Sequence, residues 1–164
     1  MGNIITIVGG GSTFTPGIVT SIALRQQELE VDEVRLFDID EERQSKVAVV
    51  VDWILKDLKS SIKLTVTTDK ETAYTNAKFV FAQMRVGKYE MREHDEKISL
   101  KHGVVGQETC GCGGMAYGLR TIFPMIDVID DVEKYARKDY WILNYSNPAA
   151  IVAIATKKLR PDAR

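Results

Sequence analysis

Short runs of β-branched and aromatic residues recur along the chain and alternate with longer segments that have helical spacing. The runs are nearly continuous, such as Ile-Ile-Thr-Ile-Val near the start and Phe-Val-Phe-Ala further on. Continuous apolar runs are typical of strands that are buried on both faces. They predict five strands, at Ile4–Val8, Glu33–Asp38, Lys63–Thr67, Lys78–Met84 and Tyr140–Tyr145.

Helical periodicity fills the intervals between these strands. In Glu41–Lys59 the apolar residues form a one-sided stripe, which predicts an amphipathic helix. Pro16 suits the front of the first helix, and Pro124 would bend a later one. The other predicted helices are Thr15–Glu28, Lys70–Asn76, Met115–Arg137 and Pro148–Leu159. The alternation of strands and helices predicts an α/β fold, a doubly wound parallel sheet with helices on both faces.

The segment from Arg85 to Gly114 follows the fourth predicted strand and is rich in glycine. Its sequence predicts an irregular loop. Ligands bind beyond the carboxyl ends of the strands in an open parallel sheet, where this segment starts. Because long loops in compact domains are functional or disordered, a functional loop is favoured here.

The composition restricts the classes of function. The 164 residues are 45% hydrophobic and 27% charged, with a net charge of −1, so we expect one domain spanning 1–164 and neither nucleic acid nor membrane as a partner. We expect the N-terminus to be a core strand rather than a leader sequence. Its two cysteines, Cys110 and Cys112, are too close to close a loop as a disulfide, which favours a reduced, cytoplasmic protein.

Three glycines, Gly9 to Gly11, follow the first strand and precede a helix that starts near Thr15. A tight turn before a helix offers backbone N–H groups and a positive dipole end to a phosphate. Phe14 stands where the dinucleotide fingerprint has a third small residue, so the turn alone is a weak signal. Its position between a strand and a helix makes a dinucleotide site the first hypothesis.

Asp38 ends the second predicted strand. An acidic residue there can accept hydrogen bonds from the ribose hydroxyls, which favours NAD over its 2′-phosphorylated relative. The alternative is that Asp38 only caps the helix that begins near Glu41. The cofactor role is favoured, since the same carboxylate could serve both purposes.

Polar residues elsewhere leave alternatives open. Asn147 follows the fifth strand, where its amide could bind sugar hydroxyls or only cap the next helix. A group of cations suits an anionic substrate but equally a solvated charged loop: Arg85, Lys88, Arg92 and Lys101. No set of histidines and cysteines has metal-ligand spacing, so no metal site is predicted within this chain.

Four motifs that follow one another along the chain make the functional hypothesis more specific. They are Gly9-Gly-Gly-Ser-Thr-Phe-Thr-Pro-Gly17, Arg85-Val-Gly-Lys-Tyr-Glu-Met-Arg92, Gly103-Val-Val-Gly-Gln-Glu-Thr-Cys110 and Leu143-Asn-Tyr-Ser-Asn-Pro-Ala149. Together they resemble glycoside hydrolase family 4, the NAD- and divalent-metal-dependent 6-phosphoglycosidases. They look most like the 6-phospho-α-glucosidase (maltose-6′-phosphate glucosidase) branch, whose substrate is a phosphorylated disaccharide. The resemblance covers essentially the whole chain.

The resemblance implies a Rossmann-like NAD-binding domain and an unusual route to hydrolysis. NAD⁺ oxidises C3 of the phosphorylated sugar, a base removes the C2 proton, the glycosidic bond breaks by elimination, and the hydride returns after water adds. The implied residue roles are the pyrophosphate region for Gly9, Gly11, Ser12 and Thr13, the ribose for Asp38, the substrate for Arg92 and Asn147, and ordering of the active-site loop for Glu108.

The chain departs from the family pattern in two ways. Cys112 takes the place of a proline, which should loosen its loop. The chain also stops before the family's metal-binding cysteine, later histidine and proposed tyrosine base, so we expect no catalytic residue or metal ligand here. The expectation is a truncated, inactive NAD-binding part of a manganese-dependent enzyme, self-associating through an open sheet edge. The alternatives are a stand-alone nucleotide-binding module and a small hydroxy-acid dehydrogenase.

Overall fold

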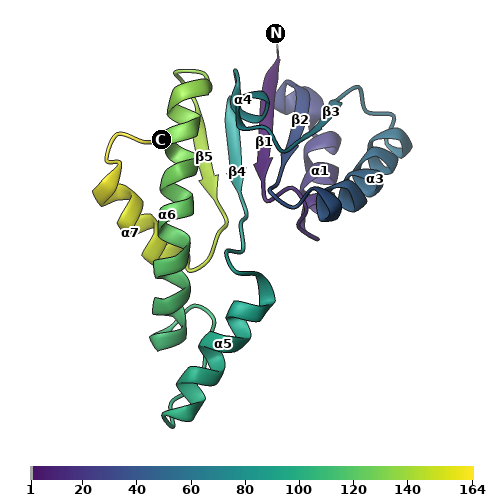
Figure 1. The fold of residues 1–164 in the computed structure, drawn as a ribbon. Helices are drawn as coiled ribbons and strands as arrows, with labels where there is room; N and C mark the ends of the chain where they lie inside the picture. The colour runs from purple at the N-terminus through teal and green to yellow at the C-terminus, as the bar shows by residue number, and fades with distance from the viewer. Residues whose placement is uncertain (1) are drawn as a thin grey trace. The chain divides into compact units, whose positions relative to one another are not determined.

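The computed structural model describes residues 2–164, which form two compact units (Figure 1). The first, here called the sheet unit, comprises the chain up to Gln83 together with Asp131–Leu143. The second, the helical unit, comprises Met84–Asp130 and Asn144–Arg164. No helix within residues 2–164 is both long and apolar enough to cross a membrane.

The sheet unit is built on five strands, in the spatial order β3-β2-β1-β4-β5 (Figure 1). β1 runs parallel to β2 and β4, and β2 runs parallel to β3. This order is that of a doubly wound nucleotide-binding sheet, so the predicted fold class is confirmed. The strands are β1 (Asn3–Val8), β2 (Val31–Phe37), β3 (Lys63–Thr67), β4 (Phe79–Ala82) and β5 (Trp141–Asn144).

Alternating side chains of β1 and β2 face two different layers. Ile7 and Leu36 are fully buried in a core that they share with Val19 and Val51 from α1 and α3. Thr6, the residue before Ile7 on β1, donates instead to the Ala73 carbonyl of α4. The helices of this unit are α1 (Thr15–Leu24), α2 (Gln26–Leu29), α3 (Glu41–Asp57) and α4 (Lys70–Tyr74).

The predicted helix over Thr15–Glu28 is wrong in one respect, because it is divided into α1 and α2. The backbone at Arg25 leaves helical geometry, with φ −115° and ψ 21°. α2 then ends at Leu29, its C-cap residue Glu30 lies in the left-handed region, and β2 begins immediately at Val31. Arg25 and its two neighbours in the sequence are neither glycine nor proline, so the local sequence carries no signal for this break.

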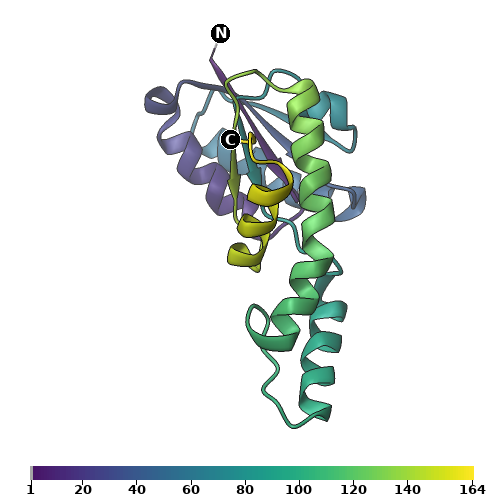
Figure 2. The ribbon, with the colours of Figure 1, turned by 90° about the vertical axis from the view of Figure 1, so that its left-hand side faces the viewer.

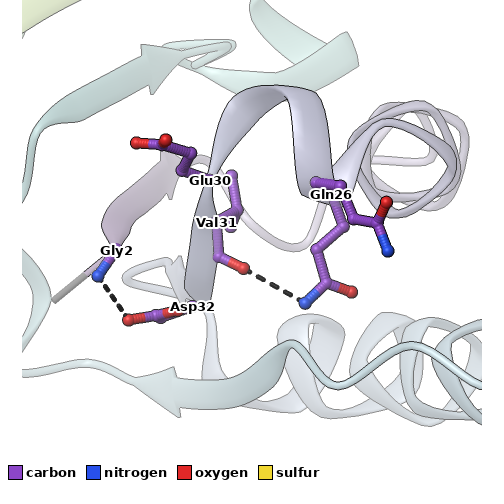
Figure 3. A pocket seen from close by; sticks show the side chains of 6 residues that line it. Gly2, Gln26, Glu30, Val31 and Asp32 are labelled. Atoms are coloured by element: carbon purple, nitrogen blue, oxygen red, sulfur yellow. Dashed lines mark hydrogen bonds between the residues drawn. The ribbon is translucent and has the colours of Figure 1, made fainter.

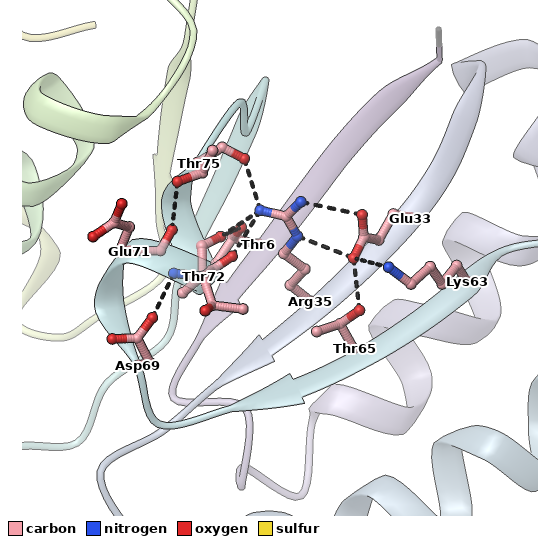
Figure 4. Close-up of polar contacts among 10 residues, drawn as sticks. Thr6, Glu33, Arg35, Lys63, Thr65, Asp69, Glu71, Thr72 and Thr75 are labelled. Carbon is pink, nitrogen blue, oxygen red and sulfur yellow. Dashed lines mark hydrogen bonds and ion pairs between the residues drawn. The ribbon is translucent and has the colours of Figure 1, made fainter.

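An ion pair lies on the α4 side of β2 (Figure 4). Arg35 Nη1 donates to the carbonyls of Thr72 at 2.8 Å and Thr75 at 2.7 Å, at the end of α4. Glu33 accepts from Arg35 Nη2 at 3.1 Å and from Thr65 Oγ1 at 2.6 Å. Burial would raise the pKa of Glu33, but these hydrogen bonds outweigh it and lower the pKa to about 2.

The helical unit contains three further helices: α5 (Lys88–Lys101), α6 (Gly111–Tyr135, whose last turn lies in the sheet unit) and α7 (Ala149–Leu159). Asp95 binds Arg120, and Ser99 Oγ lies 3.0 Å from Cys112 Sγ. These contacts place α5 antiparallel to the first half of α6 (Figure 2). α6 continues through Pro124.

The prediction of an irregular loop over Arg85–Gly114 is wrong, because α5 occupies its first half. α5 is polar around most of its surface, so apolar periodicity could not reveal it. Pairs one turn apart support it instead: Glu93 with Lys97, and Arg92 with Glu96.

Glycines near the start of α6 misled the sequence analysis for a different reason. A Cβ at Gly113 would lie 2.3 Å from the Gln107 carbonyl oxygen, and one at Gly114 would lie 2.3 Å from the Thr109 carbonyl carbon. The preceding segment therefore packs directly on the helix backbone. Here glycine permits close packing within a helix rather than marking a loop.

Candidate functional site

The glycine turn at the carboxyl end of β1 is held against the end of β2. The N–H groups of Gly9 and Gly10 both donate to the Phe37 carbonyl, at 2.9 and 3.0 Å. Gly9 has a positive φ of 81°, which glycine adopts without strain. Ser12 N donates back to the Gly9 carbonyl at 3.0 Å and closes the turn.

Asp38 meets this turn directly. Its Oδ2 accepts from Gly11 N at 2.8 Å, and its Oδ1 accepts from Asp40 N at 3.0 Å. Asp40, rather than Asp38, caps α3, because Asp40 Oδ1 accepts from Arg43 N at 3.1 Å. The alternative that Asp38 serves only as a helix cap is therefore wrong. The structure brings together the glycine turn and the carboxylate that the sequence predicted for the ribose.

Two side chains at the turn were missed by the sequence analysis. Arg43 Nε donates to the Gly11 carbonyl at 2.8 Å, across 32 positions of sequence. Gln83 Nε2 donates to Thr15 Oγ1 at 2.7 Å and to the Gly9 carbonyl at 3.3 Å. Gln83 could have been noticed as a polar residue directly after β4, whereas no local pattern distinguishes Arg43 from its charged neighbours on α3.

The arrangement of the turn fits a dinucleotide. A carboxylate at the end of the second strand suits ribose hydroxyls, and a glycine turn leading into α1 suits a pyrophosphate. Ser12 and Thr13 add two hydroxyl groups at the start of that helix, and Thr13 is exposed. The backbone of the turn also packs closely on β2, since a Cβ at Gly10 would be 2.8 Å from Leu36 Cβ.

Gly10→Ala is expected to lower the free energy of unfolding by about 1–3 kcal/mol, because the new methyl group would overpack against Leu36 and the buried Gln44. Gly17→Ala is the matched control, because a Cβ at Gly17 meets nothing within 4 Å in α1. It should stabilise by about 0.5–1 kcal/mol through helix propensity. Thermal melts of both variants test this, and equal melting temperatures would contradict it.

A pocket of about 420 Å³ lies near the amino ends of β1 and β2, away from the glycine turn (Figure 3). Gly2, Gln26, Glu30 and Asp32 are among its lining residues. Gly2 N donates to Asp32 Oδ2 at 2.5 Å within it. Because ligands of parallel sheets bind at the carboxyl ends of the strands, this pocket is not the dinucleotide site.

In the helical unit, Glu108 joins two arginines. It accepts from Arg85 Nη1, and its Oε2 lies 3.4 Å from Arg92 Nη1. Arg92 Nε also donates to Glu96 at 2.9 Å, while the Arg85 guanidinium lies 4.9 Å from the centre of the Tyr89 ring. Two members of the predicted cation group thus have carboxylate partners. Glu108 thereby links the segment before α6 to Arg85 and to Arg92 of α5.

Asn147 is exposed and precedes Pro148, to which it is joined by a cis peptide bond. Pro148 occupies the N-cap position of α7, and no side-chain capping bond is present there. The alternative that Asn147 caps the helix is therefore wrong. The neighbouring Ser146 is buried, accepts from Met84 N at 3.0 Å and donates through its N–H to Asn144 Oδ1 at 2.8 Å.

In the part of the chain that the structure describes, no group of three or more histidine, cysteine, aspartate or glutamate side chains could hold a metal ion. Cys110 and Cys112 are free and exposed.

The strand order, the glycine turn and the placement of Asp38 define the class of Rossmann-like dinucleotide-binding domains. The family model described as family 4 glycosyl hydrolase matches residues 4–164. The chain belongs to this family, which confirms the resemblance seen in the four sequence motifs.

Individual relatives agree with this assignment. A 6-phospho-α-glucosidase of Leptotrichia buccalis is 51% identical over 98% of this chain, which spans 36% of that protein. A crystal structure of a 6-phospho-α-glucosidase from gut microorganisms in complex with NAD and glucose 6-phosphate is 56% identical, with a TM-score of 0.97 over 100% of this chain and 38% of that one. A second such enzyme, in complex with NAD and Mn²⁺, is 46% identical, with a TM-score of 0.93 over 99% of this chain and 37% of that one. The chain thus spans little more than a third of the length of these proteins.

Proposed function

We propose that residues 1–164 form the NAD-binding domain of a family 4 glycosidase that hydrolyses 6-phosphoglucosides of the maltose 6′-phosphate type. The observation that carries the proposal is the contact between Gly11 and Asp38 at the carboxyl edge of the sheet, in a chain of this family. Family membership favours this function over a stand-alone nucleotide-binding module or a small hydroxy-acid dehydrogenase.

In this proposal each residue of the turn has a defined role. Gly9, Gly11, Ser12 and Thr13 bind the pyrophosphate through backbone N–H groups and hydroxyls. Asp38 accepts hydrogen bonds from the adenosine ribose while it keeps the turn docked on β2. Bound NAD⁺ would supply a hydride acceptor for sugar oxidation, and the protein contributes position and orientation.

The substrate roles belong to the helical unit. Arg92 binds the sugar phosphate, Asn147 binds sugar hydroxyls and Glu108 orders the segment between α5 and α6. Since Arg92 now contacts Glu96 and Glu108, phosphate would replace a carboxylate partner. Such an exchange is chemically conservative, because a carboxylate and a phosphate both present anionic oxygens that accept from the same guanidinium fork.

The remaining expectations concern the whole enzyme. The metal ligands for Mn²⁺ and the catalytic base would come from residues that correspond to the rest of the relatives' length, so residues 1–164 alone should be inactive. We further propose a cytoplasmic homo-oligomer without nucleic-acid or membrane partners. Support for self-association comes from the sheet edge, where Trp141 of β5 is 52% exposed.

NADH fluorescence tests the binding proposal. Titration of the chain into NADH should give saturable enhancement, competed away by NAD⁺, because the glycine turn and Asp38 are preformed within the sheet unit. Far-UV circular dichroism establishes that the protein is folded under the same conditions. A folded protein without saturable binding would contradict the proposal.

A second assay tests the expected lack of turnover. The chain should release no p-nitrophenol from p-nitrophenyl 6-phosphoglucoside in the presence of NAD⁺ and Mn²⁺. A full-length 6-phospho-α-glucosidase such as that of Leptotrichia buccalis serves as the positive control. Hydrolysis by residues 1–164 would show that the catalytic residues have been placed wrongly.

A further inference from the structure

Arg43 lies across the glycine turn, although it belongs to the first turn of α3. Its Nε donates to the Gly11 carbonyl at 2.8 Å. Its Cγ would be 3.2 Å from a Cβ at Gly11, so the aliphatic stem packs on this residue. One of the five N–H donors of the guanidinium makes the contact with Gly11. The guanidinium is therefore anchored by one edge at the proposed ribose end of the site.

Asp38 and Arg43 bind opposite polar groups of the same residue. Asp38 Oδ2 accepts from the Gly11 N–H, and Arg43 Nε donates to the Gly11 carbonyl, both at 2.8 Å. A carboxylate and a guanidinium thus stand beside one peptide residue of the turn. This juxtaposition matters because the two groups have opposite preferences for the 2′ position of the ribose.

A carboxylate accepts hydrogen bonds from a free 2′-hydroxyl and repels a 2′-phosphate, whereas a nearby arginine accommodates that phosphate as a fork of donors. We propose that Arg43 is a specificity-determining residue. Its guanidinium is a binding site for the 2′-phosphate of a phosphorylated dinucleotide, and the Asp38 carboxylate repels that phosphate in this chain. The inference rests on the proposed NAD site, and it assigns to Arg43 a role beyond support of the turn.

Two other acidic side chains at the start of α3 have partners of their own. Asp40 caps α3 through the Arg43 N–H, and Glu42 is paired with Lys46 at 2.6 Å. The positive dipole end of α3 is offset by the acidic first turn of that helix, so the guanidinium is the cation that lies against Gly11. Removal of the Asp38 charge would therefore leave the Arg43 guanidinium beside Gly11 without the carboxylate that contacts the same residue.

The experiment compares dissociation constants for NADH and NADPH in three variants. Asp38→Ser opens the site, and Asp38→Ser/Arg43→Gln removes the proposed phosphate ligand. Asp38→Ser/Lys46→Gln is the matched control, since it removes the same charge one turn further along α3. If Asp38→Ser does not fold, Asp38→Asn replaces it in all three, because an amide oxygen can still accept from Gly11 N–H.

The wild type should prefer NADH. Asp38→Ser should raise the ratio of NADPH to NADH affinity by about tenfold or more, as expected for a charge-assisted contact. Arg43→Gln should remove this gain by weakening NADPH binding more than NADH binding, and Lys46→Gln should preserve it. Higher salt should weaken NADPH binding most in the Asp38→Ser variant that retains Arg43.

Three results would overturn the inference. Arg43→Gln could leave the ratio unchanged, or it could weaken NADH and NADPH equally, which is the signature of a purely structural residue. Alternatively, Lys46→Gln could remove the gain as completely as Arg43→Gln. A wild type that binds no NADH would instead refute the proposed function, so the two failures are distinguishable.

Discussion

Glu33→Ala is expected to lower the free energy of unfolding by about 3 kcal/mol. The change leaves the Arg35 guanidinium, whose side chain is 11% exposed, without its carboxylate. The bonds from Arg35 to the Thr72 and Thr75 carbonyls keep the charge inside the sheet unit, where water cannot compensate it fully. Urea denaturation followed by circular dichroism measures the loss.

The matched control for this prediction is Glu42→Ala. Glu42 pairs with Lys46, but its side chain is 83% exposed, so the change should cost less than about 1 kcal/mol. Similar losses for Glu33→Ala and Glu42→Ala would contradict the importance of burial for the Glu33–Arg35 pair.

The dependence of the free energy of unfolding on pH provides a second test of Glu33. The pKa of Glu33 is lowered from 4.5 to about 2, so its stabilising contribution is present above pH 4.5 and is lost as the pH falls towards 2. Between pH 5 and pH 2 the wild type should therefore lose about 3 kcal/mol more than Glu33→Gln. The pKa of Asp139, lowered to about 2 by hydrogen bonds from Lys78 and Arg137, cancels in this difference because both proteins contain it. Parallel curves would contradict the prediction.

Asp38→Ala should weaken NADH binding by about 10- to 100-fold. It removes the proposed charged acceptor for the ribose hydroxyls, a contact class worth about 1.5–3 kcal/mol. It also leaves the Gly11 N–H without its acceptor and so loosens the turn. Fluorescence titration measures the affinity, and thermal melting measures the accompanying loss of stability.

Asp40→Ala separates these two effects. It removes the N-cap of α3 and should destabilise by about 1 kcal/mol, as Asp38→Ala should through the turn. Its NADH affinity should stay within about threefold of the wild type, because the Asp40 side chain caps α3 through Arg43 N, and the backbone N–H of Asp40 that donates to Asp38 is kept. An equal loss of affinity in both variants would assign the effect of Asp38 to folding alone.

Much of this fold is readable from local patterns. The five strands lie within a few residues of their predicted positions, because buried strands need continuous apolar runs. The polar helix α5 was missed, since ion pairs and packing rather than an apolar stripe stabilise it. Gly113 and Gly114 suggested a loop although they lie in α6, because glycine serves turns and close helix packing alike.

The site shows the same division. A glycine turn after a strand and an acidic strand end pointed to Gly11 and Asp38 as cofactor-binding residues, but the hydrogen bond between them came only from the structure. Neither signal distinguished Asp38 from Asp40 as the cap of α3. Nor did either reveal Arg43, whose partner lies 32 positions away.

The sequence by itself determined the class of the fold, the family and the position of the proposed dinucleotide turn, since each depends on short motifs and local periodicity. Only the tertiary structure decided which carboxylate meets Gly11, which residue caps α3 and which arginine lies over the turn. The physical reason is that a hydrogen bond is short and directional, so its partners are set by the folded path of the backbone rather than by composition.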